Sequence, residues 1–313
     1  MHGNTRRILD VLNGLASFTN ADLASSATVE WSDPAAVDAQ AHAGYVYDYY
    51  FKRFGRRGLD NNNIELLSVI HPVLRDDVLA QSSEIVGLFY LNAFYAGSGI
   101  MVYGEGLPSN IVTAGARQRW DYLAGALDIA AHELTHGVTE FTSNLIYQNE
   151  SGALNEAFSD VMATAAEFFY QTPGSGPLRA DYLIGEDVIT PGGIRSLSDP
   201  GAFSDPDHYS RRFLGEDDNG GVHANMTIAT HAYYLSIEGG MNRTSGLNVT
   251  GVGQANREQI EKVFYRGFTQ MMPSNATFAV ARTVTIQAAR DLYGAGSAAE
   301  RAVTEAWTAV GVN

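Results

Sequence analysis

The segment His132-Glu-Leu-Thr-His136 contains the residues of this chain that are best suited to metal chemistry. In a helix, positions i and i+4 lie on one face about a turn apart, so both imidazoles can reach one ion. Glu133 lies beside that face, where its carboxylate can act on a metal-bound water. Two histidines on one helix also occur without any metal, so the interpretation depends on a third ligand.

A catalytic zinc site needs three protein ligands and an open position for water. A histidine shortly after His136 cannot complete the site, because Thr139 and Thr142 occupy the places where a glycine and a histidine would be required. Glu156 lies on the next predicted helix and can be the third ligand. Asp160 follows one turn later on the same face, where a carboxylate can accept the ring N–H of a ligating histidine.

Helices must position these side chains. Apolar residues recur at helical spacing through 123–134, which predicts a helix that carries both histidines. A second helix is predicted over 153–170, and it carries the third ligand. Further helices are predicted at 222–237, 257–271, 275–293 and 298–310.

The first third of the chain has a different pattern. Short apolar runs between turn signals, such as 44–50, predict strands with a helix or two among them. The uncharged stretch 85–104 is interpreted as buried strands joined by a turn, because its polar residues and glycines argue against a membrane span. The sequence therefore predicts a mixed N-terminal part followed by a mostly helical C-terminal part.

Composition excludes several classes of function. The net charge of −15 argues against nucleic acid or an anionic membrane as a partner. The chain has no cysteine, which excludes disulfides, thiolate zinc sites and cysteine nucleophiles. The first residues, Met1-His-Gly and then Arg6-Arg7, have no apolar stretch behind them, so no signal peptide is expected.

Several motifs resemble the thermolysin family of zinc peptidases, and the resemblance runs from about Asp33 to the end of the chain. The motifs are His132-Glu-Leu-Thr-His136, Tyr147-Gln-Asn-Glu-Ser-Gly152, Asn155-Glu156-x-x-x-Asp160, Arg195-Ser-Leu-Ser-Asp-Pro200, Asp205-Pro-Asp-His-Tyr-Ser210, Asp218-Asn-Gly-Gly-Val-His223 and Trp307-Thr-Ala-Val-Gly-Val312. The resemblance implies an α+β fold of two domains with the active-site cleft between them. Residues 1–146 would form an N-terminal domain with β structure and the zinc-binding helix, and residues 147–313 a mostly helical domain.

The resemblance implies a zinc-dependent endopeptidase that hydrolyses internal peptide bonds of peptides and proteins. Such a protein would be secreted and monomeric. Glu133 would be the general base. Tyr147 and His223 would stabilise the oxyanion, with Asp218 orienting and charging His223. Asn155 would support the other zinc-binding histidine.

Substrate contacts are implied in the same way. Arg195 would donate to a substrate carbonyl beyond the cleavage point, while Asn92 and Ala93 would bind the substrate backbone as an edge strand does. The pocket for the side chain after the scissile bond falls on four apolar residues, Ile129, Ile184, Val188 and Ile194. An apolar pocket predicts cleavage on the amino side of a bulky hydrophobic residue.

A structural calcium ion is also implied, because clustered carboxylates on a core helix need a cation or protons. The acidic residues that match the family's calcium cluster are Asp128, Glu167, Asp181 and Glu186. Leu183 occupies one further position of that cluster and could offer only its carbonyl. Arg179 stands where a second, adjacent ion would bring its charge, so one calcium ion is expected in this cluster.

The chain departs from the family in its N-terminal part. The long N-terminal strand region of the family is largely missing. Additional sequence lies around 73–89, and the spacing between Asn92 and His132 is lengthened by 108–120. These departures lie on the substrate side of the implied cleft, so the family does not predict the detailed specificity.

Two alternative functions remain open. One is an aminopeptidase of the same His-Glu-x-x-His class, although the chain has no Gly-x-Met-Glu-Asn-type stretch that would bind a free amine. Cleavage of an N-terminally blocked peptide separates the two activities. The other is a non-enzymatic binding protein with a relic site, which the presence of Glu133, Tyr147 and His223 argues against.

Overall fold

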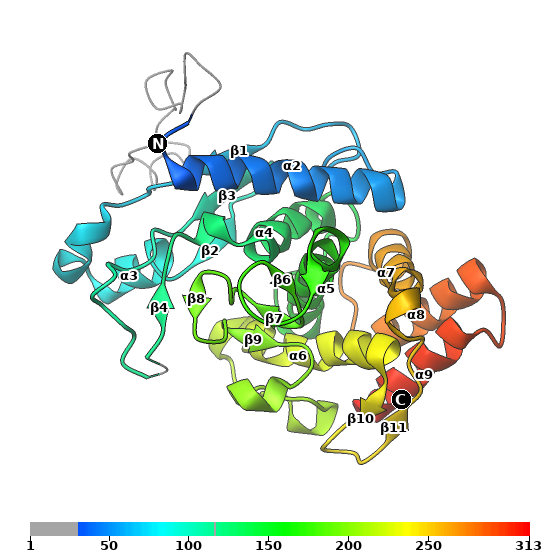
Figure 1. Cartoon of the computed structure of the whole chain (residues 1–313). Helices are drawn as coiled ribbons and strands as arrows, with labels where there is room; N and C mark the ends of the chain where they lie inside the picture. Colours follow the sequence, from blue (N-terminus) through cyan, green and yellow to red (C-terminus); the bar gives the residue numbers. More distant parts are fainter. Residues whose placement is uncertain (1–30, 116) are drawn as a thin grey trace. The chain divides into compact units, whose positions relative to one another are not determined.

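The structure, a computed structural model, describes residues 31–115 and 117–313 (Figure 1). The N-terminal residues considered for a signal peptide therefore lie outside the described part. The chain divides into two compact units. The first comprises Met1–Gly137, Ala166–Ala180 and Gly185–Ile194, and the second comprises Val138–Ala165, Asp181–Ile184 and Arg195–Asn313.

The long helix α2, Pro34–Phe54, belongs to the first unit. The Asp33 side chain accepts hydrogen bonds from the first backbone N–H groups, and a proline at the first position presets the helical φ angle. Gly55, at a φ of 72°, ends the helix in the left-handed conformation. The strand prediction for 44–50 is wrong, because these residues lie within α2 and its buried face includes Val46 and Tyr49.

A three-stranded sheet in the first unit has the order β1-β3-β2. Strand β3, Ile100–Tyr103, pairs in parallel with β1, Leu67–Val69, and antiparallel with β2, Ala93–Tyr95. The stretch 85–104 is only partly strand, because α3, Ser83–Phe89, begins where the Ser82 side chain accepts from the Ile85 N–H. Phe89 and Val102 are fully buried in a cluster beside this sheet.

Shorter elements complete the first unit. The 3-10 helix η2 spans Arg75–Ala80, and η3, Leu123–Gly125, packs against α2. The short strand pairs are β4, Arg119–Trp120, with β8, Ile189–Thr190, and β5, Thr172–Pro173, with β6, Arg179–Ala180. The central helices α4, Leu127–Glu140, and α5, Asn149–Tyr170, contribute residues to both units. Both helices were predicted.

The second unit is mainly helical, as predicted. Its long helices are α6, Asp217–Glu238; α7, Arg257–Arg266; α8, Phe278–Tyr293; and α9, Ala298–Ala309. Its short helices are η4, Pro200–Phe203; η5, Tyr209–Arg211; η6, Gln254–Asn256; and the π-helix η7, Gly267–Met271. Its strand pairs are β7, Leu183–Ile184, with β9, Arg195–Ser196, and β10, Gly240–Met241, with β11, Asn248–Val249. Helix α9 packs against α6 and α8, and its fully buried Trp307 donates to the Thr285 hydroxyl.

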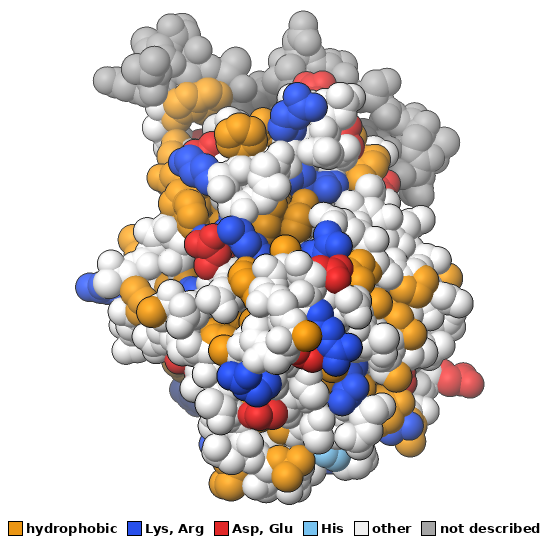
Figure 2. Space-filling view, turned by 90° about the vertical axis from the view of Figure 1, so that its right-hand side faces the viewer, with side chains coloured by type: hydrophobic (Ala, Val, Ile, Leu, Met, Phe, Trp, Pro, Cys, Tyr) orange, Lys and Arg blue, Asp and Glu red, His pale blue; other side chains and the backbone are white. Residues whose placement is uncertain are grey.

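The surface carries charges of both signs. The face shown in Figure 2 presents Lys and Arg side chains beside Asp and Glu side chains rather than a continuous acidic surface. Some of the ion pairs lie on one helix, as between Lys262 and Glu258. Among the described residues, no helix is both long enough and apolar enough to cross a membrane.

A network of charged side chains lies at the start of α2 in the first unit, where His71 contacts the N-cap residue Asp33 and also Glu105. Nδ1 of His71 lies 2.9 Å from Glu105 Oε2, and Nε2 lies 3.0 Å from Asp33 Oδ2. Both ring nitrogens face carboxylates, so both carry hydrogen and the ring is an imidazolium. The hydrogen bond to Glu105, whose side chain is only 4% exposed, raises the pKa of His71.

This network predicts a loss of stability in mild alkali. Because the folded state raises the pKa of His71, its contribution is fully present below the ordinary histidine pKa of about 6.5 and disappears as pH rises through the folded value. We expect the melting temperature of the wild type to fall over that range. A His71→Asn variant should be less stable than the wild type at neutral pH, and its melting temperature should change less with pH. Thermal unfolding from about pH 6 to about pH 9 measures this. A His42→Asn variant should still show the fall in melting temperature with rising pH. If His71→Asn showed an equal fall, His71 would not be the group responsible.

Candidate active site

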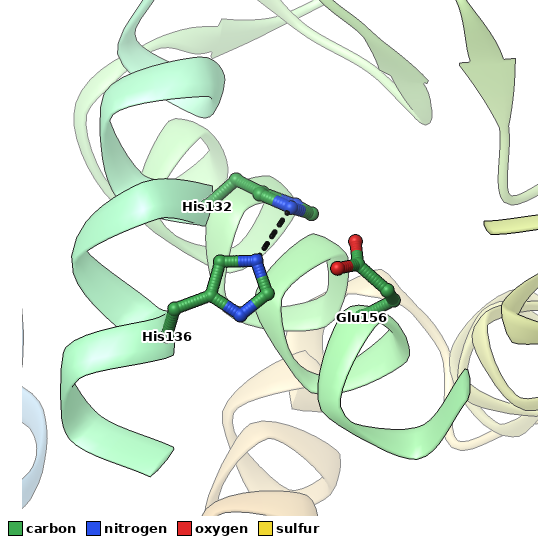
Figure 3. A group of neighbouring side chains, drawn as sticks. All are labelled: His132, His136 and Glu156. Carbon is green, nitrogen blue, oxygen red and sulfur yellow. Dashed lines mark hydrogen bonds between the residues drawn. The ribbon is translucent and has the colours of Figure 1, made fainter. Parts of the chain in front are cut away.

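Two helices bring the predicted zinc ligands together. His132 and His136 lie on α4 and Glu156 lies on α5, and Figure 3 shows the three side chains pointing toward one another. One ligand atom from each lies within 4.8 Å of the other two. The Nε2 atoms of the two histidines are 3.2 Å apart. Two nitrogens bound to one tetrahedral zinc at about 2.0–2.1 Å would be about 3.3 Å apart, so the spacing fits zinc.

The helix α4 is fixed by its buried face, which carries Ala130, Ala131 and Leu134. The Thr135 hydroxyl donates to the Ala131 carbonyl and lies 2.7 Å from the hydroxyl of Tyr50 on α2. These contacts set the rotation of the helix and so the direction of its histidines. Two imidazoles and one carboxylate are a donor set that zinc accepts in catalytic sites, so the residues present fit the ion.

Glu133 and Glu156 are both strongly buried. Glu133 is 6% exposed and directly follows His132 on α4. Glu156 is 1% exposed. A buried carboxylate needs hydrogen bonds or a cation near it, which agrees with a metal-binding role for Glu156.

The predicted oxyanion residues meet beside Glu156 in the second unit. The Tyr147 hydroxyl donates to Glu156 Oε1 and lies 3.3 Å from Nε2 of His223. Asp218 makes two hydrogen bonds with His223: its Oδ1 lies 2.7 Å from Nδ1 of the imidazole, and its Oδ2 accepts from the backbone N–H at 2.8 Å. Tyr147 and the imidazole of His223 are both about half-exposed.

Asp160 pairs with Arg195 in the second unit. The Arg195 guanidinium donates through Nε at 3.0 Å and Nη2 at 2.8 Å to the two carboxylate oxygens of Asp160. Burial opposes the charge of Arg195, but the ion pair with Asp160 outweighs it and raises the pKa of the guanidinium. The support of a zinc histidine by Asp160 stays a prediction.

Asp205 is a neighbour that sequence reasoning left without a role. Burial raises its pKa to about 6; the charge of Arg195 lowers it and that of Asp160 raises it further. The only sequence feature that could have pointed to Asp205 is its place in the motif Asp205-Pro-Asp-His-Tyr-Ser210. The carboxyl group of Asp205 thus interacts electrostatically with the predicted substrate-binding arginine.

Asn155 contacts a loop near the site. Its side-chain Nδ2 donates to the Leu145 carbonyl at 3.2 Å, two residues before Tyr147. The side chain is 9% exposed. This bond helps to fix the loop between α4 and α5, whereas the predicted support of a zinc-binding histidine stays a prediction.

The predicted substrate-binding residues lie in both units, and their contact with a substrate stays a prediction. Ile129 and Val188 are buried in the first unit, Ile184 is buried in the second, and Ile194 is partly buried. Asn92 is exposed directly before β2, which is an edge strand of the sheet β1-β3-β2. An edge strand has free backbone groups for an extended peptide.

The predicted calcium residues are partly connected. Asp128 is 1% exposed, and its Oδ2 accepts from the backbone N–H of Gly185, which precedes Glu186. Glu167 is fully buried on α5. Asp181 Oδ1 accepts from the Leu183 N–H at 2.7 Å. The convergence of all of them on one ion stays a prediction.

Comparisons with known proteins agree with these motifs. A profile of the thermolysin metallopeptidase catalytic domain matches residues 2–140, and a profile of the alpha-helical domain matches residues 143–312. Bacillolysin from Bacillus cereus is 43% identical over 285 residues, which cover 90% of this chain and 44% of the relative. Thermolysin from Alicyclobacillus acidocaldarius is 41% identical over 284 residues, with coverages of 90% and 46%. The chain thus spans about half the length of these curated relatives.

A solved structure is also similar. The precursor of protealysin, a metalloproteinase from Serratia proteamaculans, matches with a TM-score of 0.72 and 28% sequence identity over 93% of this chain and 82% of that one. The predicted two-domain architecture is therefore confirmed, whereas the boundary after residue 146 stays a prediction. With both domain profiles matched and the zinc ligands convergent, this chain belongs to the thermolysin family of metallopeptidases.

Proposed function

We propose that the chain is a zinc-dependent endopeptidase that cleaves internal peptide bonds on the amino side of bulky hydrophobic residues. The observation that carries the proposal is the convergence of His132, His136 and Glu156 with a buried Glu133 beside them. The apolar residues implied for the substrate pocket support the preference for hydrophobic side chains.

The side chains of the chain itself provide the acid–base chemistry. Bound zinc would supply a water of lowered pKa and polarise the scissile carbonyl. Glu133 accepts the proton of the attacking water and passes it to the leaving amine. Asp218 accepts the Nδ1–H of His223 and orients the imidazole, so that Nε2 faces the developing oxyanion together with the Tyr147 hydroxyl.

Arg195 orients the substrate. Its pairing with Asp160 occupies Nε–H and one N–H of Nη2, and a guanidinium has further N–H donors that can bind a substrate carbonyl. The bidentate pair holds the plane of the guanidinium in one orientation. The substrate carbonyl would therefore meet a donor that is already positioned.

The proposal includes one structural calcium ion held by the acidic residues around Asp128, and peptide or protein substrates as the partners. Neither nucleic acid nor a membrane is a proposed partner. A secreted, monomeric protein is part of the proposal and rests on the family resemblance.

Peptides blocked at the N-terminus test the proposed function. We expect cleavage before Leu or Phe to exceed cleavage before Asp by at least tenfold, because an apolar pocket leaves a carboxylate unpaired. Mass spectrometry of the products locates the cleaved bond. A chelator should abolish activity and zinc should restore it, while His136→Ala should lose both zinc and activity and His42→Ala neither. Cleavage of unblocked peptides alone would indicate an aminopeptidase, and no turnover of any peptide by the zinc-loaded protein would indicate a relic site.

A further inference from the structure

Gly152, on the first turn of α5, lies close to the backbone of Tyr147 and to the side chain of Val222, the residue before His223. A Cβ atom at Gly152 would lie 2.5 Å from Cγ1 of Val222 and 3.0 Å from the carbonyl carbon of Tyr147. Both distances are too short or nearly too short for a real side chain. Val222 directly precedes His223 and is fully buried, and its branched side chain has little freedom to move away.

The same two segments meet at a second glycine. A Cβ atom at Gly220, whose φ is 88°, would lie 2.2 Å from Oδ1 of Asn149, which follows Tyr147 by two residues. Asn149 itself has a left-handed backbone with a φ of 51°. Such conformations in residues other than glycine are uncommon and persist only where the surrounding structure holds them, often near functional sites.

Hydrogen bonds also fix the Tyr147 segment to the start of α5. The Ser151 hydroxyl donates to the carbonyl of Ile146 at 2.7 Å, and the Gly152 N–H donates to the carbonyl of Gln148 at 3.1 Å. The residues on either side of Tyr147 are thus bound to the first turn of α5. The lateral position of the loop relative to His223 then depends on how closely Val222 approaches Gly152.

We propose that Gly152 is a positioning residue for the catalytic pair. By letting the Val222 side chain and the Tyr147 backbone both approach the place where a Cβ atom would lie, it sets the 3.3 Å separation between the Tyr147 hydroxyl and Nε2 of His223. Gly152 has no side chain with which to bind a substrate. This inference rests on the proposed function, because it concerns the two donors that would bind the oxyanion.

The experiment compares turnover per bound zinc ion in Gly152→Ala and wild-type protein. Removing one oxyanion donor lowers kcat by about 10²–10³-fold, so a displaced pair should lower kcat by at least about tenfold. KM should change less than threefold, because substrate binding elsewhere is intact. Zinc content per folded protein should not change. A Gly44→Ala variant on α2, where a Cβ atom would meet nothing within 4 Å, is the control and should retain full turnover.

A second substitution distinguishes positioning from a purely structural role. Val222→Ala removes the atom at 2.5 Å, so the double variant Gly152→Ala/Val222→Ala should recover at least a third of the kcat of Val222→Ala alone. If Gly152→Ala does not fold, this double variant carries the test. The inference is overturned if Gly152→Ala stays within threefold of wild type per zinc, or if a folded double variant remains below a tenth of Val222→Ala. A zinc-loaded wild type without peptidase activity would overturn the proposed function itself, and this inference with it.

Discussion

A Glu133→Gln variant is expected to lose at least about 10²-fold of its peptidase activity while it keeps its zinc and its fold. The substitution replaces a proton acceptor with an amide of nearly the same shape, and Glu133 is not among the three convergent zinc ligands. The attacking water then lacks its proposed base. Comparing kcat/KM and zinc content of the variant and the wild type measures the effect.

Glu140→Gln is the matched control, because it removes a carboxylate two turns further along α4. It should keep full activity and full zinc. If Glu133→Gln stayed within a few-fold of wild type, another group would be the base. Loss of zinc along with activity would show instead that Glu133 holds the metal.

Removal of calcium with zinc kept saturated is expected to lower the melting temperature and shorten the active lifetime. A cation that binds only the folded protein stabilises it by about 2.7 kcal/mol at a hundredfold excess over Kd. Asp128 is almost fully buried, and without a cation the predicted cluster would place like charges together. Because Asp128 precedes His132 by one turn of α4, loss of the ion should also weaken zinc binding.

Asp128→Asn should reproduce the loss, since it removes one of the negative charges that attract the ion. An Asp76→Asn variant, which changes an exposed carboxylate of η2, should respond to calcium as the wild type does. Thermal unfolding at a series of calcium concentrations measures both. If the melting temperature did not change over a wide range of calcium concentrations, these acidic residues would not bind a calcium ion.

The zinc site could be predicted because its residues lie at helical spacing on two strongly periodic helices. His132 and His136 are separated by four residues, and the helix geometry alone directs both to one side. Tyr147, Asp218 and His223 could not be brought together by spacing, because loops with left-handed residues separate them. Their placement was available only from the family motifs.

The N-terminal part was harder to predict. The run 44–50 is rich in tyrosine and valine, which favour strands, yet it lies in the middle of α2. Asp33 and Pro34 start that helix and Gly55 ends it, and these signals outweigh the local preference. In 85–104 the periodicity changes within a few residues from helix to strand, and an apolar run of that length does not show where the change occurs.

The left-handed residues before His223 tie catalysis to the folding of α6. From Asp218 to Gly221 the φ angles are all positive, so regular helix begins only at Val222. Asp218 Oδ2 accepts the backbone N–H of His223, as a capping residue does, while Oδ1 holds the imidazole. One carboxylate therefore caps the first turn of regular helix and orients His223, the proposed oxyanion donor. A substitution of Asp218 is therefore expected to change both the orientation of His223 and the ease with which α6 forms its first turn. Its effects on activity and on folding cannot be varied separately.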